Sequence, residues 1–171
     1  MGTLFDLTGK TAIITGSSRG IGRSIAEQMA AHGARVVISS RKEEACKQVA
    51  DAINAEHGDG TALAVAANIS SKQELQNLVT VTENTFGQID IVVCNAASNP
   101  YYGPLAEIED GQFEKILNNN IIANNWLIGM VSPSMIERRD GAIIIISSIG
   151  GLKGSPVIGA YCISKAADFQ L

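Results

Sequence analysis

Short, continuous apolar runs alternate with longer segments of helical periodicity along this chain. Residues 36–38 and 143–146 contain no polar position, whereas a strand with one solvated face alternates apolar and polar residues. Such runs predict strands that are buried on both faces, and therefore a parallel sheet covered by helices. Because helical segments separate the strands, we expect βαβ units with right-handed crossovers. The sequence thus predicts a doubly wound α/β fold with helices on both faces of a parallel sheet.

The same pattern gives the expected elements and the domain organisation. Strands are expected at residues 11–15, 36–38, 62–66, 91–93 and 142–146, and helices at about 20–31, 43–56, 72–86, 113–138 and from about 160. Pro133 is expected to kink the fourth of these helices or to start a new turn. No repeat, low-complexity tract or linker interrupts the chain, so we expect one domain over residues 1–171.

Composition and charge argue against several classes of protein. The hydrophobic fraction is 46% and the charged fraction 18%, which predicts a folded rather than a disordered chain. The formal net charge of −4 argues against nucleic acid as the main partner. No apolar run approaches the roughly 20 residues of a membrane span, and residues 1–10 lack the pattern of a secretory signal. Cys46, Cys94 and Cys162 have no metal-ligand spacing, so we expect reduced thiols, no bound metal and a cytoplasmic location.

A glycine-rich turn joins the first expected strand to the first expected helix. Its glycines are spaced as Gly16-x-x-x-Gly20-x-Gly22. Gly16 permits a tight exit from the strand, and Gly20 and Gly22 let the backbone approach a pyrophosphate at the positive end of the helix. The alternative is an ordinary strand–helix turn without a ligand. We expect the turn to bind a dinucleotide through Gly16, Ser18, Arg19, Gly20, Ile21 and Gly22.

The end of the second expected strand predicts which dinucleotide is bound. An acidic residue there usually holds the ribose hydroxyls of NAD, but residues 39–42 read Ser-Ser-Arg-Lys, with no carboxylate before Glu43. Ser40, Arg41 and Lys42, together with Arg19, suit a 2′-phosphate, which arginine binds with two parallel hydrogen bonds. We therefore expect NADP(H), with NAD(H) less favoured. The alternative is a solvated basic start of the second helix.

Tyr161 and Lys165 lie four residues apart at the start of the last expected helix, so they share one face. The lysine ammonium can stabilise a phenolate, and Tyr161 can then donate and accept a proton near neutral pH. Ser148 lies thirteen residues before Tyr161, after the fifth expected strand. Neighbouring residues of a strand point to opposite sides, so either Ser147 or Ser148 faces the pair, but not both.

Together these motifs resemble the short-chain dehydrogenase/reductase family over essentially all of the chain. The turn matches the family pattern T-G-x-x-x-G-x-G, and the family spacing to Tyr161 favours Ser148 over Ser147. The resemblance implies a Rossmann fold in which Tyr161 exchanges a proton with the substrate oxygen and Ser148 polarises that oxygen. It implies that Lys165 holds the nicotinamide ribose, and that Tyr161 also borders the cofactor. It further implies that Asn120, the last of three consecutive asparagines, supports a water-linked proton route.

Two further segments match cofactor-binding positions of the family. Asn68 and Ile69 follow the third expected strand, where an amide can accept a hydrogen bond from the adenine amino group. The alternative at Asn68 is a simple turn or a helix cap. Residues 94–97, Cys-Asn-Ala-Ala, match the family segment N-N-A-G with two departures. Asn95 is expected to support the central sheet and, with Ala96, to lie along the cofactor.

The resemblance also implies a reaction. We expect an NADPH-dependent carbonyl reductase or alcohol dehydrogenase, because residues 39–42 and 147–150 are similar to those of the carbonyl and retinal reductase members. The alternatives are a 3-oxoacyl-thioester reductase of fatty-acid synthesis and a nucleotide-binding unit without turnover. The partner is expected to be a small carbonyl or alcohol substrate, and residues 99–104 are expected to line the mouth of the site. Assembly as a homodimer or homotetramer is expected through residues 113–138 and the last helix.

The chain stops at Leu171, about two turns into its last expected helix. Members of the family normally continue with the rest of this helix, two more strands and a segment that covers the substrate. We therefore expect a fragment, or part of a longer polypeptide, without these C-terminal elements.

Overall fold

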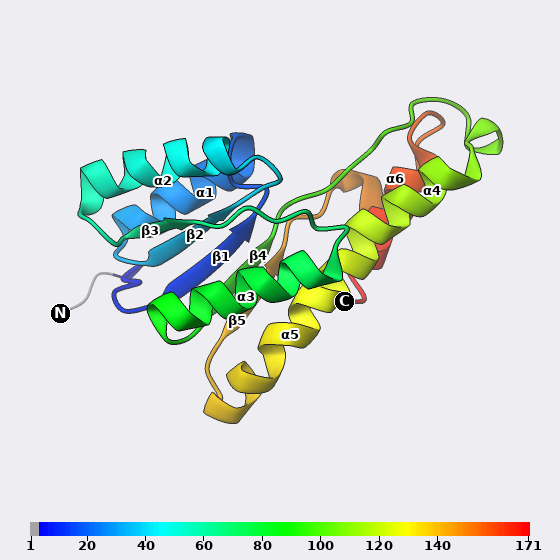
Figure 1. Cartoon of the computed structure of the whole chain (residues 1–171). Coiled ribbons are helices and arrows are strands. Elements are labelled where there is room, and N and C mark those ends of the chain that lie inside the picture. Colours follow the sequence, from blue (N-terminus) through cyan, green and yellow to red (C-terminus); the bar gives the residue numbers. More distant parts are fainter. Residues whose placement is uncertain (1–3) are drawn as a thin grey trace.

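Five parallel strands form one sheet in the order β3-β2-β1-β4-β5 in the computed structural model, which describes residues 4–171 (Figure 1). The strands are β1 (Thr11–Thr15), β2 (Arg35–Ser39), β3 (Ala62–Ala64), β4 (Ile91–Cys94) and β5 (Ala142–Ile145). From β1 the chain builds outward to β3 and then returns to the centre to form β4 and β5. The order reverses between β1 and β4, and doubly wound folds bind ligands at the carboxyl ends of the strands beside such a reversal.

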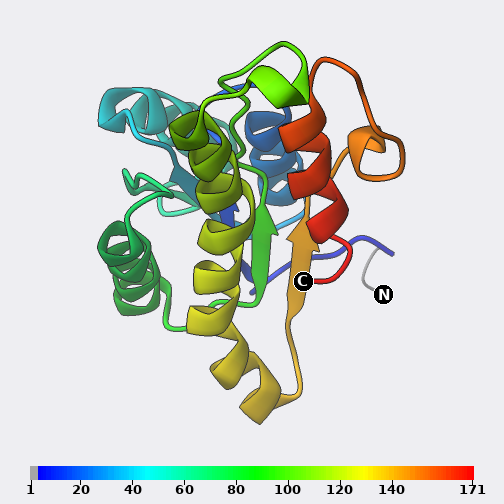
Figure 2. The same ribbon diagram turned by 90° about the vertical axis from the view of Figure 1, so that its right-hand side faces the viewer.

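Helices connect the strands and cover both faces of the sheet. Helices α1 (Gly20–Ala31) and α2 (Glu43–His57) lie on one face, and α3 (Lys72–Phe86) and α5 (Ala123–Arg138) lie on the other (Figure 1 and Figure 2). Helices α4 (Asp110–Leu117) and α6 (Gly159–Ala167) extend past the carboxyl ends of β4 and β5 (Figure 1). The predicted doubly wound fold is thus confirmed. Within residues 4–171, no helix combines the length and the apolar character needed to cross a bilayer.

Two hydrophobic cores hold the helices to the sheet. The neighbours Ile13 and Ile14 of β1 point to opposite faces, which explains why the run is apolar without alternation. Fully burying an aliphatic side chain contributes about 1.5–3 kcal/mol. The helix residues of the α3–α5 core include Leu75, Leu78, Leu127 and Val131, and those of the α1–α2 core include Ala26, Val49 and Ile53.

Strand β5 differs from the other strands in its burial. The expectation that residues 143–146 are buried on both faces is wrong, because Ile143 is 37% and Ile144 41% exposed. The physical reason is position: β5 is the edge strand of the sheet, and among residues 4–171 it pairs only with β4. A continuous apolar run therefore identified the strand correctly but not the burial of its side chains.

The helix expected at residues 113–138 begins earlier and contains an irregular turn. Helix α4 starts at Asp110, and the π-helical turn η2 (Asn118–Ile122) separates it from α5. Helix α5 continues through Pro133, so the proline starts no new element, and the helix ends before Arg139, which has a left-handed φ of 54°. π-helical turns inside helices are frequent at functional sites, and this one carries Asn120.

Candidate active site

The glycine turn leaves β1 and enters α1 through two residues of positive φ. Gly16 has φ 68° and Gly20 φ 58°, values that residues with a Cβ rarely adopt. Gly22, in the first turn of α1, lies so close to the turn that a Cβ there would stand 2.6 Å from the carbonyl oxygen of Gly16. The glycine spacing is therefore a requirement of the backbone itself.

Ser17 fastens the glycine turn to the end of β2. Its side chain is fully buried, and its hydroxyl donates to the carbonyl oxygen of Ile14 (2.6 Å) and accepts from the amide of Ser39 (2.9 Å). The Ser17 amide donates in return to the carbonyl oxygen of Ser39 (3.1 Å). Sequence reasoning chose the half-buried Ser18 and missed Ser17. The signal for Ser17 is a small hydroxyl residue directly after a strand-ending glycine.

Thr15 and Asn95 fasten the same turn to the end of β4. Thr15 Oγ1 accepts from the backbone amides of Asn95 and Ala96, both at 3.0 Å. The Asn95 side chain donates Nδ2 to the carbonyl oxygen of Thr15 (2.8 Å) and, at 3.3 Å, to that of Gly16. Asn95 thus supports the sheet at the reversal of strand order, and Thr15 is a further residue that sequence reasoning missed. A role of Asn95 and Ala96 along the cofactor stays a prediction.

The N-terminus of α1 offers hydrogen-bond donors to an anion. Its cap residue, Arg19, makes no side-chain hydrogen bond to the helix, and the first turn contains no acidic residue. Arg19 and Ile21 are exposed, and a Cβ at Gly20 would meet no atom within 4 Å, so the approach to these amides is open. Free amides at a helix N-terminus attract phosphate groups. The residues present therefore fit the pyrophosphate of a dinucleotide.

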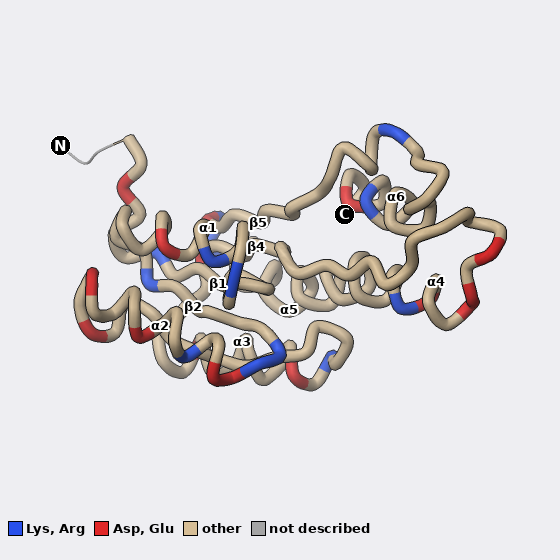
Figure 3. The backbone as a smooth tube through the Cα atoms, turned by 90° about the horizontal axis from the view of Figure 1, so that it is seen from above, with Lys and Arg blue, Asp and Glu red and all other residues tan. Residues whose placement is uncertain are grey.

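Ser40, Arg41 and Lys42 follow β2 on the same edge of the sheet. The Ser40 hydroxyl lies 3.1 Å from the Cys46 thiol and accepts from the Lys42 amide at 3.4 Å. Arg41 and Lys42 are exposed, and neither forms an ion pair within the part of the chain that the structure describes. Figure 3 shows that acidic residues outnumber basic ones along α2 itself. Two unpaired cations at this place fit a 2′-phosphate.

Asn68 and Ile69 lie after β3. Asn68 Oδ1 accepts from the amide (3.2 Å) and the hydroxyl (2.7 Å) of Ser70, which makes a local turn. The cap of α3 is Ser71, whose hydroxyl accepts from the amide of Glu74. The side chain of Ile69 packs against the α3–α5 core. The turn alternative thus describes Asn68, and contacts of these two residues with adenine stay a prediction.

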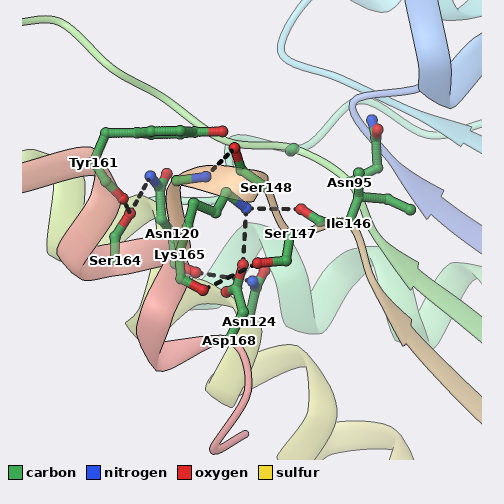
Figure 4. A network of polar contacts seen from close by, with 12 residues as sticks. Asn95, Asn120, Asn124, Ile146, Ser147, Ser148, Tyr161, Ser164, Lys165 and Asp168 are labelled. Carbon is green, nitrogen blue, oxygen red and sulfur yellow. Dashed lines mark hydrogen bonds and ion pairs between the residues drawn. The ribbon is translucent and has the colours of Figure 1, made fainter. Parts of the chain in front are cut away.

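Tyr161, Ser148 and Lys165 come together where the chain leaves β5 and enters α6 (Figure 4). The Ser148 hydroxyl accepts from the amide of Gly150 (3.1 Å) and lies on the side of the Tyr161 hydroxyl. The Ser147 hydroxyl donates to the backbone carbonyl of Lys165 (3.0 Å) and so points at the helix. The Lys165 ammonium nitrogen lies 5.9 Å from the centre of the Tyr161 ring. Between the two serines, this geometry favours Ser148.

Lys165 is a buried cation with a buried counter-charge. Its Nζ donates to the carbonyl oxygen of Ile146 (2.7 Å) and to Asp168 Oδ2 (3.0 Å). The side chains of Lys165 and Asp168 are only 3% and 1% exposed. Sequence reasoning missed Asp168. A carboxylate three residues after a lysine, on the same side of a helix, is the signal that could have found it.

The π-helical turn carries Asn120 into the centre of the site. Its fully buried side chain accepts at Oδ1 from the amide of Ser98 (2.8 Å) and donates Nδ2 to the Ser98 carbonyl (3.0 Å) and to Ser164 Oγ (2.9 Å). The Ser164 hydroxyl donates to the carbonyl oxygen of Tyr161 (2.7 Å). Asn120 thus ties the loop after β4 to the helix that carries Tyr161. Its own carbonyl accepts from Asn124 Nδ2 (2.8 Å), and the water-linked proton route stays a prediction.

The loop after β4 reaches over to the segment that precedes α6. The Gly103 amide donates to the carbonyl oxygen of Val157 (2.8 Å), and the Tyr101 hydroxyl donates to that of Pro104 (2.8 Å). Tyr102 is 78% exposed. The loop therefore presents an exposed aromatic ring beside the segment that precedes α6, and the expectation that residues 99–104 line the mouth of the site stays a prediction.

The three cysteines are buried free thiols. Burial raises the pKa of the Cys94 thiol to about 12, and the nearby Asp168 carboxylate adds to this rise. Cys94 is therefore protonated at neutral pH, and a protonated thiol is a poor nucleophile. Among residues 4–171, no three His, Cys, Asp or Glu side chains gather as a metal site would require.

The sequence matches that of known proteins over nearly its whole length. The family described as short chain dehydrogenase matches residues 10–171. The chain is 36% identical over 162 residues to dehydrogenase/reductase SDR family member 4 of Rattus norvegicus, and the match covers 94% of this chain and 57% of that protein. It is 40% identical over 164 residues to the 3-oxoacyl-(acyl-carrier-protein) reductase FabG of Rickettsia prowazekii, with coverage of 95% and 64%. The chain thus spans only part of these relatives.

Solved structures show the same arrangement. A short-chain type dehydrogenase/reductase from Mycobacterium marinum superposes with a TM-score of 0.90 at 32% identity, over 98% of this chain and 68% of that one. A metagenomic short-chain oxidoreductase in complex with NADP gives a TM-score of 0.87 at 33% identity, over 93% and 71%. With the family match over residues 10–171, these likenesses show that the chain belongs to the short-chain dehydrogenase/reductase family.

Proposed function

We propose that this chain supplies the cofactor-binding and catalytic part of an NADP(H)-dependent oxidoreductase that interconverts a carbonyl compound and an alcohol. The observation that carries the proposal is the meeting of Tyr161, Ser148 and the buried Lys165 on the same sheet edge as the glycine turn. A tyrosine beside a lysine ammonium suits proton transfer near neutral pH. Membership of the family supports the reaction class, and both groups of residues belong to one proposed domain over residues 1–171.

NADP(H), when bound, supplies the hydride donor or acceptor of the reaction. The N-terminus of α1 and the open glycine turn bind its pyrophosphate, and Arg19, Arg41 and Lys42 bind its 2′-phosphate. The similar metagenomic oxidoreductase was solved in complex with NADP, which supports this choice over NAD. The remaining proposed cofactor contacts are Gly16, Ser18, Gly20, Ile21, Gly22, Ser40, Asn68, Ile69, Asn95, Ala96, Tyr161 and Lys165.

The catalytic side chains divide the work of proton transfer. Tyr161 donates its hydroxyl proton to the carbonyl oxygen during reduction and accepts a proton from the alcohol during oxidation. The Ser148 hydroxyl accepts from Gly150, so its own proton is free to be donated to the same substrate oxygen, which polarises the carbonyl. The positive charge of Lys165 stabilises the phenolate that forms on Tyr161. Asn120 fixes the helix of Tyr161 and supports the route by which the proton is replaced.

The substrate class is a small carbonyl or alcohol compound. The chain resembles carbonyl and retinal reductases at residues 39–42 and 147–150. A 3-oxoacyl thioester is the competing substrate, because the chain is 40% identical to a reductase of that name. A nucleotide-binding unit without turnover is the competing function. It is favoured by the half-exposed Ile143 and Ile144 in the strand on which the proposed catalytic residues stand.

We also propose a cytoplasmic homodimer or homotetramer that associates through α5 and α6. Ile122 and Ile136, at the two ends of the α5 region, are 38% and 73% exposed, and Ile163 on α6 is 45% exposed. Apolar side chains that protrude from neighbouring helices suit burial between subunits. Light scattering that shows a monomer would contradict this assembly.

Turnover of NADPH with simple ketones and with an acetoacetyl thioester tests the function, and a parallel titration with NADH tests the cofactor. Tyr161→Phe should lower kcat by at least about a hundredfold, because the proton donor is lost, and should leave NADPH binding nearly intact, because the other cofactor contacts remain. Thr85→Val removes a hydroxyl on the exposed side of α3, away from the proposed site, and is the control that should keep full activity. Activity of Tyr161→Phe near that of the wild type would contradict the mechanism. Binding of NADPH without turnover of any substrate would favour the nucleotide-binding unit.

A further inference from the structure

Lys165 and Asp168 form a buried ion pair that joins α6 to the end of β5. The Lys165 Nζ and Asp168 Oδ2 lie 3.0 Å apart, and both side chains are almost completely shielded from solvent. The same Nζ donates to the carbonyl oxygen of Ile146, directly after β5, at 2.7 Å. Figure 4 shows the ammonium held between these two oxygens. The position of the catalytic cation is therefore set by one backbone group and one side chain.

The contacts of Lys165 leave one hydrogen-bond donor for the site. A lysine ammonium has three hydrogens to donate. The Ile146 carbonyl and the Asp168 carboxylate take two of them. With two directions fixed, the third is fixed as well, because the three N–H bonds are arranged tetrahedrally. Asp168 therefore decides where the remaining donor points.

The carboxylate of Asp168 makes no hydrogen bond or ion pair other than that with Lys165 within residues 4–171. Its second oxygen, Oδ1, is buried and receives no hydrogen bond within residues 4–171. Lys165 is also the only cation that pairs with it in the described part of the chain. A buried ammonium and a buried carboxylate are each unfavourable without a partner, so each offsets the cost of burying the other. Without Asp168, Lys165 would retain the Ile146 carbonyl alone.

We propose that Asp168 is a positioning residue for Lys165, which fixes the place of the ammonium and directs its third hydrogen to the nicotinamide ribose. This role rests on the proposed function. Asp168 touches neither cofactor nor substrate and acts only through Lys165. Its effect is therefore confined to the nicotinamide half of the cofactor, and the adenine half, bound at the far end of the same edge, does not depend on it.

Equilibrium binding of two ligands to the purified chain tests this role without any need for turnover. NADPH carries both halves, whereas adenosine 2′,5′-bisphosphate carries the adenine and the 2′-phosphate but no nicotinamide ribose. Asp168→Leu, which keeps a similar volume without an acceptor, should weaken NADPH about tenfold, the loss expected for one hydrogen bond to a charged group. It should leave the bisphosphate unchanged. The NADPH affinity of Asp168→Asn should lie between those of the wild type and Asp168→Leu. Asp168→Glu should keep part of the affinity that Asp168→Leu loses.

A second background tests that Asp168 acts through Lys165. In the chain that carries Lys165→Met, the further change Asp168→Leu should have no effect on NADPH affinity, because the group that it positions is gone. Asp51→Leu is the matched control, since Asp51 is paired with Lys47 on the exposed surface of α2. It should change the affinity for neither ligand.

The outcomes separate this role from the proposed function. The role of Asp168 is supported if Asp168→Leu weakens the binding of NADPH but not of the bisphosphate, and if this weakening is absent in the chain that carries Lys165→Met. Unchanged NADPH affinity in a folded Asp168→Leu or Asp168→Asn chain overturns the proposed role. An equal loss of affinity for both ligands also overturns it, because Asp168 would then only maintain the fold. If Asp168→Leu does not fold, the nearly isosteric Asp168→Asn decides. A wild-type chain that binds neither ligand overturns the proposed function, and the role of Asp168 with it.

Discussion

The cofactor half and the catalytic half of the proposed site are held in place by different kinds of contact. Around the glycine turn, backbone conformations and short hydroxyl contacts of Thr15 and Ser17 join the completely buried β1 to its two neighbouring strands. Around α6, polar side chains bond to distant parts of the chain, as Asn120 does to Ser98 and Lys165 does to the Ile146 carbonyl. The first half therefore depends on the absence of side-chain volume, and the second depends on particular polar groups.

The two halves also differ in their support. The cofactor half stands on β1, whose five residues are at most 3% exposed, at the centre of the sheet. The catalytic half stands on β5, the edge strand with two half-exposed isoleucines. Local opening is easiest where few apolar contacts must be broken. Substitutions in the two halves should consequently act on different measurable quantities.

The largest effect is expected where volume is added to the cofactor half. In Gly22→Ala, the new Cβ would stand 2.6 Å from the Gly16 carbonyl oxygen, so the turn or the helix has to move. We expect a loss of about 1–3 kcal/mol in the free energy of unfolding, and NADPH binding too weak to measure. Urea unfolding and a fluorescence titration with NADPH check both expectations.

Gly129→Ala in α5 is the control for this substitution. A Cβ at Gly129 meets no atom within 4 Å, so alanine should stabilise the helix by up to about 1 kcal/mol and leave NADPH binding unchanged. If Gly22→Ala binds NADPH as the wild type does, the cofactor half is not limited by volume, and the contrast between the halves is lost.

A smaller and different effect is expected when a polar group is removed from the catalytic half. Asn120→Ala deletes three hydrogen bonds and leaves the Ser98 amide without its partner, at a cost of about 1–3 kcal/mol in stability. Because Asn120 ties down the helix of Tyr161, we expect kcat to fall about tenfold while the Kd of NADPH stays within about twofold. Unfolding curves, steady-state kinetics and binding titrations separate these quantities.

Asn118→Ala provides the matched control for Asn120→Ala. Asn118 lies two residues away in the same π-helical turn, but it is exposed. Its removal should change neither stability nor kcat by more than experimental error. The reverse order, with Asn118→Ala the more damaging variant, would show that a different asparagine of the three occupies the central position.

The difference between the halves also explains what the sequence could and could not predict. The apolar runs and the glycine spacing are local patterns, and they predicted the presence of all five described strands and the turn at Gly16, although β3 ends at Ala64 rather than at residue 66. Ser17 was missed because its partner, Ser39, lies 22 residues away on another strand. Asp168 lies only three residues after Lys165, and it was missed because that spacing does not show whether the pair is buried or exposed. The exposure of Ile143 was also unpredictable, since an apolar run does not show whether its strand lies at the centre or at the edge.

The smallest effect is expected at the opposite end of the sheet, and it tests whether burial rather than ion pairing makes Lys165–Asp168 important. Lys10 precedes β1 and Asp140 precedes β5, and their charged atoms lie 2.7 Å apart, closer than the buried pair at 3.0 Å. Both side chains are well exposed, so solvent screens their attraction. Asp140→Asn should therefore lower Tm only slightly and leave NADPH binding unchanged.

The pH dependence of this small effect follows from the direction of two pKa shifts. The hydrogen bond from Lys10 lowers the pKa of Asp140 below its ordinary 3.8, and the same bond raises the pKa of Lys10 above 10.5. Because the carboxyl pKa is lowered in the folded protein, its contribution to stability is present above pH 3.8 and is lost as the pH falls through the pKa of folded Asp140. Because the lysine pKa is raised, its contribution is present below pH 10.5 and is lost as the pH rises through the pKa of folded Lys10. The Tm difference between the wild type and Asp140→Asn should accordingly persist between these limits, vanish in acid, and shrink in high salt. A difference as large as that caused by Asp168→Asn would contradict the argument, because it would show that a short distance suffices and that burial adds nothing.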